Sequence, residues 1–169
     1  MNMKNVKKMT QASLFASLTA ICAWLSIPIP PISFTMQTFA VFLALETLGG
    51  KWGSVSIGLY LLLGMVGLPV FSGFRGGAAA LLDVTGGFLW GFLAAGLVYW
   101  ALERFGKIPA SVFAMLACYG CGCWWFSVYA GGVGFGAAIM TCVMPYLIPD
   151  AIKIGLAYTI GKRLGKFVK

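Results

Sequence analysis

Asp150 and Lys153 are the residues of this sequence whose types and spacing point most directly to chemistry. They lie three residues apart in P-Y-L-I-P-D-A-I-K (Pro145–Lys153), so on a helix they share one face about one turn apart. The mainly apolar run Gly155–Ile160 indicates that the pair opens a helix continuing into lipid or protein. Because a charge at membrane depth is costly and normally faces a cavity or another charge, we expect a functional pair. The alternative is a solvated pair in a loop.

The composition indicates the setting of this pair. The chain has 169 residues, of which 60% are hydrophobic and 9% are charged, and its mean hydropathy is +0.93. Soluble domains carry about 25% charged residues, so we expect an integral membrane protein. No long polar segment interrupts the sequence, so residues 1–169 are expected to form a single membrane domain. The net charge of +8 fits basic residues at membrane edges better than nucleic-acid binding.

The apolar segments predict an all-α, six-transmembrane-helix bundle. A spanning helix needs about 20 mostly apolar residues. The candidates are Thr10–Ile27, Phe34–Leu48, Trp52–Gly67, Phe88–Leu102, Ile108–Tyr129 and Pro149–Leu164. Ser26–Ser33, with three prolines, is expected to be a loop, and Leu68–Gly87 a long Gly-rich outer loop between helices three and four. Ala137–Met144 is expected to be a short element. The basic segment Met1–Lys8 is followed by no cleavage pattern, so it is interpreted as leading into a retained first span.

The basic residues predict the orientation of the bundle. With six spans, one side holds Lys4, Lys7, Lys8, Lys51, Arg104, Lys107, Lys162, Arg163, Lys166 and Lys169. The other side holds only Arg75 among the basic residues. The positive-inside rule therefore predicts cytoplasmic N- and C-termini in a multi-pass protein of the cell membrane. It also places Asp150 near the outer end of the sixth helix, where an acid suits the helix dipole.

Two further places carry polar or glycine residues with a possible binding role. Gly73, Gly76 and Gly77 flank Arg75 in the predicted outer loop, and glycine permits close backbone approach to a ligand. A lid over a pocket is favoured there, with a flexible loop as the alternative. Gln37 lies early in the second helix, where its amide either bridges helices or contacts a ligand.

Residues near the predicted membrane edges have simpler explanations. Trp124, Trp125 and Tyr129 end the fifth helix at the outer interface, where an aromatic belt explains them as well as a ligand platform does. Glu46 lies near Lys51 at the inner edge and is expected to be interfacial.

Ala12, Ala16 and Ala20 recur every four residues in the first predicted helix. Small residues at this spacing let another helix approach closely. That second helix belongs either to a partner subunit or to this bundle, and the spacing alone does not decide between them.

Several other chemistries are disfavoured. The sequence has no His, and Cys118 and Cys121, although spaced as C-x-x-C, lie in an apolar run, so buried apolar cysteines are favoured over a metal or redox site. No G-x-x-x-x-G-K-[ST] motif occurs, so there is no recognisable P-loop for ATP. An intramembrane enzyme that uses Asp150 as acid or base stays an alternative, although no nucleophile–base pair is visible. A structural membrane subunit that binds no ligand is the other.

Motifs along most of the chain are similar to those of one family. They are F-T-M-Q-T-F at Gln37, L-G-G-K-W-G at Lys51, Y-L-L-L-G-M-V-G-L-P-V-F at Tyr60–Phe71, T-G-G-F at Thr85–Phe88, Y-x-x-G-x-x-W at Tyr119–Trp125, and P-D-x-x-K at Pro149–Lys153. Together they resemble the BioY family, the biotin-capturing S components of energy-coupling factor (ECF) transporters. The sequence departs from the family pattern at Asp83 and Val84, where Gly-Pro is usual, and at Arg75, where a small or polar residue is usual. The departures affect the expected ligand contacts, and no role is assigned to Asp83.

The resemblance implies a six-helix bundle with an outward-facing pocket. Such a protein captures biotin from outside and delivers it with an ATP-driven coupling module. The expected partners are biotin, a transmembrane coupling subunit, two ATPase subunits and membrane lipid, with no nucleic acid. ATP is used by those partners, so this chain is expected to be neither an enzyme nor a binder of cofactors or metals.

The resemblance also implies a set of contact residues. Biotin has a ureido ring with two N–H donors and one carbonyl acceptor, a hydrophobic thioether ring and a carboxylate tail. An Asp can accept from the N–H groups, a Lys or an amide can donate to the carbonyl, and a Trp can pack against the ring. The expected substrate-binding residues are Asp150, Lys153, Gln37, Arg75, Trp125, Tyr119, Gly73, Gly76, Gly77 and Gly87. The alanine row Ala12, Ala16 and Ala20 is similar to the A-x-x-x-A face by which S components dock on the coupling subunit.

Overall fold

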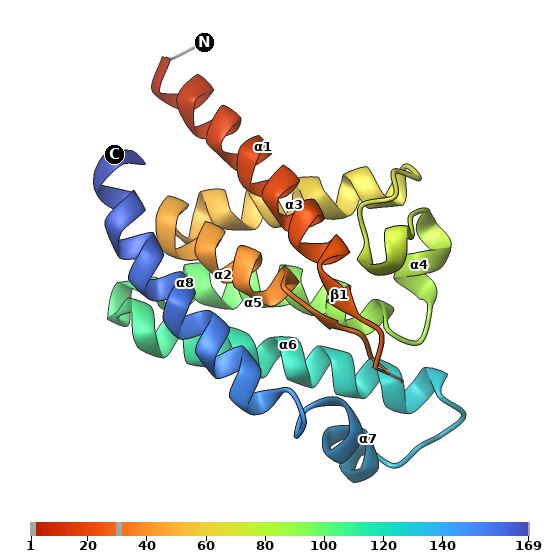
Figure 1. Cartoon of the computed structure of the whole chain (residues 1–169). Coiled ribbons are helices and arrows are strands. Elements are labelled where there is room, and N and C mark those ends of the chain that lie inside the picture. The colour runs from red at the N-terminus through yellow and green to blue at the C-terminus, as the bar shows by residue number, and fades with distance from the viewer. Residues whose placement is uncertain (1–2, 30–31, 169) are drawn as a thin grey trace.

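The chain forms a bundle of helices with one small hairpin (Figure 1). The computed structural model describes residues 3–29 and 32–168, apart from the side chains of Lys4 and Val168. In chain order the elements are α1 (Met3–Trp24), β1 (Ser26–Ile27), β2 (Phe34–Thr35), α2 (Gln37–Leu48), α3 (Gly50–Met65), a 3-10 turn (Ser72–Phe74), α4 (Ala78–Leu82), α5 (Gly86–Leu102), a second 3-10 turn (Glu103–Phe105), α6 (Lys107–Tyr129), α7 (Phe135–Cys142) and α8 (Leu147–Val168). The longer helices occur in the predicted order, which confirms a mostly helical protein.

The boundaries of the last elements follow from the prolines. α8 begins at Leu147, two residues before the predicted start at Pro149. Pro149 therefore lies in the first turn, where its missing N–H removes no helical hydrogen bond. The short element expected at Ala137–Met144 is α7, Phe135–Cys142.

The segment Ser26–Ser33 was expected to be a loop, but its first residues form one strand of a short hairpin. β1 and β2 pair antiparallel, with Ser26 opposite Thr35 and Ile27 opposite Phe34. The pairing stops where Pro28 follows β1, because proline has no N–H to donate to a neighbouring strand. The sequence Pro30–Pro31 lies outside the described residues.

Glycines bring α5 and α6 into close contact. A Cβ built on Gly87 would lie 2.2 Å from Cβ of Trp125, and one on Gly122 would lie 2.3 Å from the ring of Phe88. A larger residue at Gly87 would have to displace Trp125, and one at Gly122 would have to displace the ring of Phe88. Small residues at helix interfaces are the usual means of close packing in membrane proteins.

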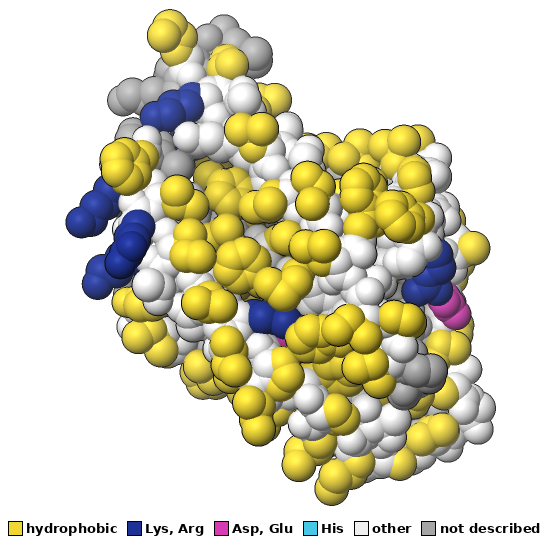
Figure 2. Space-filling view, viewed as in Figure 1, with side chains coloured by type: hydrophobic (Ala, Val, Ile, Leu, Met, Phe, Trp, Pro, Cys, Tyr) yellow, Lys and Arg dark blue, Asp and Glu magenta, His cyan; other side chains and the backbone are white. Residues whose placement is uncertain are grey.

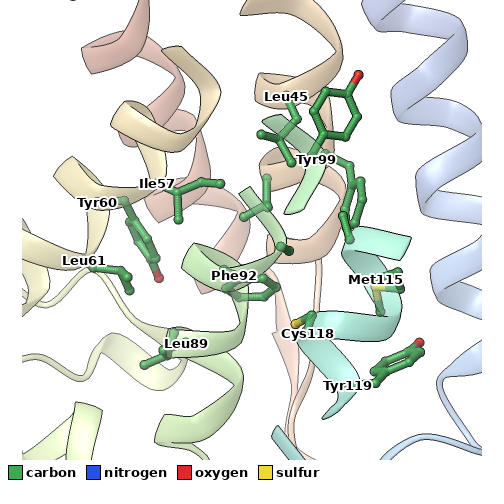
Figure 3. Packing of buried hydrophobic residues seen from close by; sticks show 14 of the residues in the cluster. Leu45, Ile57, Tyr60, Leu61, Leu89, Phe92, Tyr99, Met115, Cys118 and Tyr119 are labelled. Atoms are coloured by element: carbon green, nitrogen blue, oxygen red, sulfur yellow. The ribbon is translucent and has the colours of Figure 1, made fainter. Parts of the chain in front are cut away.

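The core lies between α2, α3, α5 and α6. Figure 3 shows Tyr60 of α3, Leu89 and Phe92 of α5, and Met115 and Cys118 of α6 directed into a shared apolar interior. Tyr60 and Cys118 are almost completely buried. This packed interior supports one wall of the cavity described below.

The helix lengths give fewer clear membrane spans than the sequence predicted. Within the described residues, Gly86–Phe105 and Lys107–Tyr129 are long and apolar enough to cross a membrane. The pair Phe135–Cys142 and Leu147–Phe167, bent by 60°, makes a third if it forms one span. Gln37–Leu48 is apolar but short, with 12 residues. Length and composition therefore support two or three spans, and the predicted six are not confirmed.

The ends of the bundle differ in character. Both termini and the α2–α3 and α5–α6 turns lie at one end, whereas the hairpin, α4 and α7 lie at the other (Figure 1). Figure 2 shows a largely hydrophobic face with basic side chains near the termini, near the middle and, beside an acidic side chain, at the right.

The alanine row of α1 lies inside the bundle. Ala12, Ala16 and Ala20 are 1%, 0% and 6% exposed. They are buried because α1 packs against α2 and α3, and small side chains permit that approach. The burial favours packing within this chain over direct contact of these residues with a partner.

Glu46, which was expected at the inner membrane edge near Lys51, is 1% exposed and finds its partners inside the bundle. One carboxylate oxygen accepts from Ser111 at 2.8 Å, and the other lies 3.4 Å from Nζ of Lys107. Lys107 also donates to the backbone carbonyl of Glu46. The acid is buried because α6 supplies the opposite charge that a buried carboxylate needs.

Candidate functional site

A cavity of about 660 Å³ lies at the end of the bundle that carries the hairpin. Its wall combines the hairpin, the segment before and after α4, and the facing parts of α2, α5, α6 and α8. Most of the lining surface is apolar, and polar and charged side chains stand among the apolar ones. Such a composition is typical of sites for small organic molecules.

The predicted pair is present in the cavity wall. Nζ of Lys153 lies 2.9 Å from Oδ1 of Asp150, and each residue is 5% exposed. Lys153 also donates to the carbonyl of Thr35 at 2.8 Å and lies 3.8 Å from the ring centre of Phe34. Tyr119 donates to Oδ2 of Asp150 at 2.9 Å. The pair thus joins α8 to the hairpin and to α6.

The geometry of the pair suits a ligand with both donors and acceptors. Each carboxylate oxygen of Asp150 has room in its lone pairs for a second donor. An ammonium has three N–H donors, and Asp150 and Thr35 take two of those of Lys153. A planar group that donates and accepts along one edge can therefore contact both residues.

Figure 3 shows how Tyr119 is positioned. The ring leaves α6 and its hydroxyl points towards α8, where the hydrogen bond to Asp150 forms. Tyr119 is 8% exposed and lines the cavity. The sequence motif identified this residue, and the structure places it beside the charged pair.

Gln37 both bridges helices and faces the cavity. Its Nε2 donates to the hydroxyl of Tyr60 at 2.5 Å, and Tyr60 in turn donates to the carbonyl of Val70 at 3.1 Å. Thr35 donates to Oε1 of Gln37 at 3.3 Å. The helix-bridging alternative is therefore confirmed, and the residue also lines the cavity.

Arg75 lies at the cavity wall in contact with an acid. Its Nη1 is 2.6 Å from Oδ2 of Asp83, and Nη2 is 3.4 Å from the hydroxyl of Thr85. Its Nε donates to the carbonyl of Ser72 at 3.3 Å. Gly73 also lines the cavity and has a φ of 70°, which glycine adopts without strain. Asp83, to which the sequence assigned no role, is thus the partner of Arg75.

Four predicted contact residues do not line the cavity: Gly76, Gly77, Gly87 and Trp125. Gly76 lies so close to Leu68 that a Cβ would be 2.2 Å from its carbonyl oxygen. Gly77 has a φ of 88° and donates its N–H to Gly64 at 2.7 Å.

Trp125 does not line the cavity but contacts Asp83, which does. Its indole N–H donates to the carbonyl of Asp83 at 2.9 Å, and its ring stacks on Tyr129 at 4.5 Å. Because Gly87 packs directly against Trp125, these residues hold the Asp83 segment against α6.

Several lining residues were not identified from the sequence. They are mainly apolar or hydroxyl-bearing: Thr38, Thr85, Phe88, Leu89, Phe92, Met115, Cys118, Cys142 and Tyr146. Tyr146 lies within the stretch Pro145–Lys153, and its hydroxyl donates to the carbonyl of Ile32 in the hairpin connection. The available signals were the position of Phe88 as the last residue of T-G-G-F and that of Tyr146 four residues before Asp150.

The fold and the site together define a class of protein. The structure resembles a crystal structure of the S-component for biotin from an ECF-type ABC transporter, with a TM-score of 0.88 and 27% identity. The match covers 98% of this chain and 94% of that chain. This chain is therefore a mostly helical membrane protein with the fold of an ECF S component.

The family is shown by the whole sequence: the chain belongs to the BioY family, which it matches over residues 1–169. It is 37% identical over 166 residues to the "Biotin transporter BioY" of Thermotoga maritima, covering 95% of this chain and 97% of that protein. It is 38% identical over 160 residues to the "Probable biotin transporter BioY" of Pyrococcus horikoshii, covering 94% and 96%. With "Biotin transporter BioY2" of Lactococcus lactis subsp. cremoris it shares 34% over 170 residues, covering 96% and 93%.

Proposed function

We propose that this chain is the biotin-binding subunit of an ECF vitamin transporter and is not an enzyme. It captures biotin in the cavity and delivers it with an ATP-driven coupling module. The observation that carries this proposal is the buried Asp150–Lys153 pair in the wall of a largely apolar cavity, in a chain of the BioY family.

Biotin matches the polar groups of the cavity. We assign the ureido ring to Asp150 and Lys153, because the carboxylate can accept from a ring N–H and the ammonium can donate to the ring carbonyl. The thioether ring would lie against apolar lining residues such as Phe88 and Phe92. Arg75, at the cavity wall near the surface, would reach the carboxylate tail.

Binding is tested directly by calorimetry on detergent-purified protein. We expect tight binding of biotin and much weaker binding of thiamine and riboflavin, because neither presents the ureido group to Asp150 and Lys153 together. Mass spectrometry of the purified protein should also detect copurified biotin, unchanged on incubation. Equal affinity for all three vitamins, or no binding, would contradict the proposal and favour a structural subunit.

The role of Arg75 is tested with biotin and a biotin amide that lacks the carboxylate charge. If Arg75 contacts the carboxylate, Arg75→Ser should weaken biotin binding much more than amide binding, because a guanidinium pairs strongly with a carboxylate. Lys51→Ser, which removes an exposed basic residue near the opposite end, should change neither affinity. An equal loss for both ligands would place Arg75 at the ureido ring, and no loss would leave it a partner of Asp83 only.

We further propose a single domain in the cell membrane, with six spans and cytoplasmic termini. The position of both termini and of the α2–α3 and α5–α6 turns at one end supports this arrangement. These are the segments that carry most of the basic residues, and basic residues favour the cytoplasmic side. The cavity then lies at the outer end, where it can receive biotin from outside.

The proposed partners are a transmembrane coupling subunit and two ATPase subunits. We place the contact on the exposed side of α1 at Ser13 and Ser17, next to the buried alanine row. Their hydroxyls donate to carbonyls four residues earlier, Met9 and Ser13, so they expose small surfaces without unpaired donors. Such surfaces let a second helix approach closely within lipid.

A further inference from the structure

Arg75 and Asp83 form an ion pair whose opposite charges cancel, and this affects how the cavity binds a charged ligand. The two side chains are 47% and 42% exposed and 2.6 Å apart, and both line the cavity. The other oxygen of Asp83 accepts from the backbone N–H of Val84 at 2.7 Å. The carboxylate is therefore fixed against the guanidinium by its own backbone.

The charged residues of the cavity lining, within the described part of the chain, sum to zero. They are Arg75 with Asp83 near the surface and Lys153 with Asp150 deeper in. A ligand carboxylate that approaches Arg75 therefore meets no net positive charge. It also lies next to the carboxylate of Asp83, and like charges at this range repel.

We propose that Asp83 competes with the ligand carboxylate for Arg75 and thereby sets how strongly the site prefers a charged over an uncharged tail. This inference rests on the proposed function, because it takes biotin as the ligand. Asp83 occupies Nη1 of Arg75, one of the donors that a carboxylate would use for two-pronged pairing. The wild-type site therefore prefers a charged tail over an uncharged tail less strongly than a site with Arg75 but without Asp83 would.

A purely supporting role for Asp83 is the competing explanation, and the contacts argue against it. Arg75 has two further partners, the carbonyl of Ser72 and the hydroxyl of Thr85, which orient it when Asp83 is changed. The contact with Trp125 uses the backbone carbonyl of Asp83 and does not depend on the side chain. The carboxylate of Asp83 therefore affects the charge of the cavity more than it stabilises the local fold.

The test is Asp83→Asn, measured by calorimetry with biotin and with biotin amide. Asn keeps an oxygen for the N–H of Val84 but loses the negative charge. We expect biotin affinity to rise about threefold to fivefold, the size of an exposed ion pair, and amide affinity to stay unchanged. In the double variant Arg75→Ser/Asp83→Asn the preference gained for biotin should disappear.

The possible outcomes separate the explanations. An unchanged ratio of the biotin and amide affinities would overturn the inference, and so would an equal gain for both ligands. A loss of biotin affinity with unchanged amide affinity would show that Asp83 positions Arg75 instead. Asp83→Ser, which also removes the charge, provides a second variant if the first unfolds. If the wild-type protein binds neither ligand, the proposed function itself fails. If the wild-type protein binds both ligands and the ratio of their affinities does not change with Asp83, only this inference fails.

Discussion

Replacing Asp150 with Asn is expected to weaken biotin binding by well over tenfold while the protein still folds. Asp150 is 5% exposed and pairs with Lys153 at 2.9 Å, so the change removes one member of a buried, charge-assisted contact. Removing one such partner costs about 2–5 kcal/mol, part of it from the stranded charge. Tyr119 can still donate to the amide oxygen, and Lys153 keeps its bond to Thr35, so local structure is retained. Calorimetry measures the affinity, and thermal unfolding in detergent measures the stability.

The matched control is Glu46→Gln, at the opposite end of α2 from Gln37. Glu46 is also buried and also pairs with a lysine, Lys107, but neither residue lines the cavity. This variant should lose stability and keep its affinity for biotin. Unchanged biotin affinity in Asp150→Asn would assign the Asp150–Lys153 pair a structural role. An equal affinity loss in both variants would indicate a general effect of disturbing a buried charge.

The order of the helices and the central pair could be predicted from the sequence because both follow from local patterns. A long apolar run identifies a helix, and the spacing of Asp150 and Lys153 identifies a shared face whatever the tertiary structure. The hairpin could not be predicted in this way. It depends on two short pairings across the segment 26–35, and three prolines in that segment resemble an ordinary loop.

The remaining differences concern partners that are distant in the sequence. Arg75 and Asp83 are eight residues apart with the short helix α4 between them, so their contact depends on how the segment 72–83 folds. Glu46 pairs with Lys107 rather than the nearby Lys51 because side chains at the start of α6 reach the end of α2. The role of Gly87 and Trp125 as a close helix contact likewise needs the relative position of α5 and α6. Sequence spacing identifies which residues share a face, but it does not identify what that face contacts.

The alanine row shows the same limit, and it leads to a prediction with a large effect on transport. Ser17→Trp should leave biotin affinity within about twofold, because Ser17 is exposed on α1 and does not line the cavity. The bulky side chain should block close approach of a second helix. Uptake of biotin by cells and copurification of the coupling subunit should therefore be abolished. Leu97→Trp, on the exposed side of α5, serves as the control and should preserve both.

Ala16→Trp is the comparison that decides which face of α1 docks. Ala16 is 0% exposed against neighbouring helices, so a large side chain there overpacks the bundle, at a cost of typically 1–3 kcal/mol or more. We expect lower thermal stability and a loss of biotin binding together with uptake. If Ala16→Trp instead keeps full biotin affinity and loses only the coupling subunit, whereas Ser17→Trp transports normally, the docking face is the alanine row. That result would require α1 to leave α2 and α3 when the partner binds, because the row is covered by those helices in this structure.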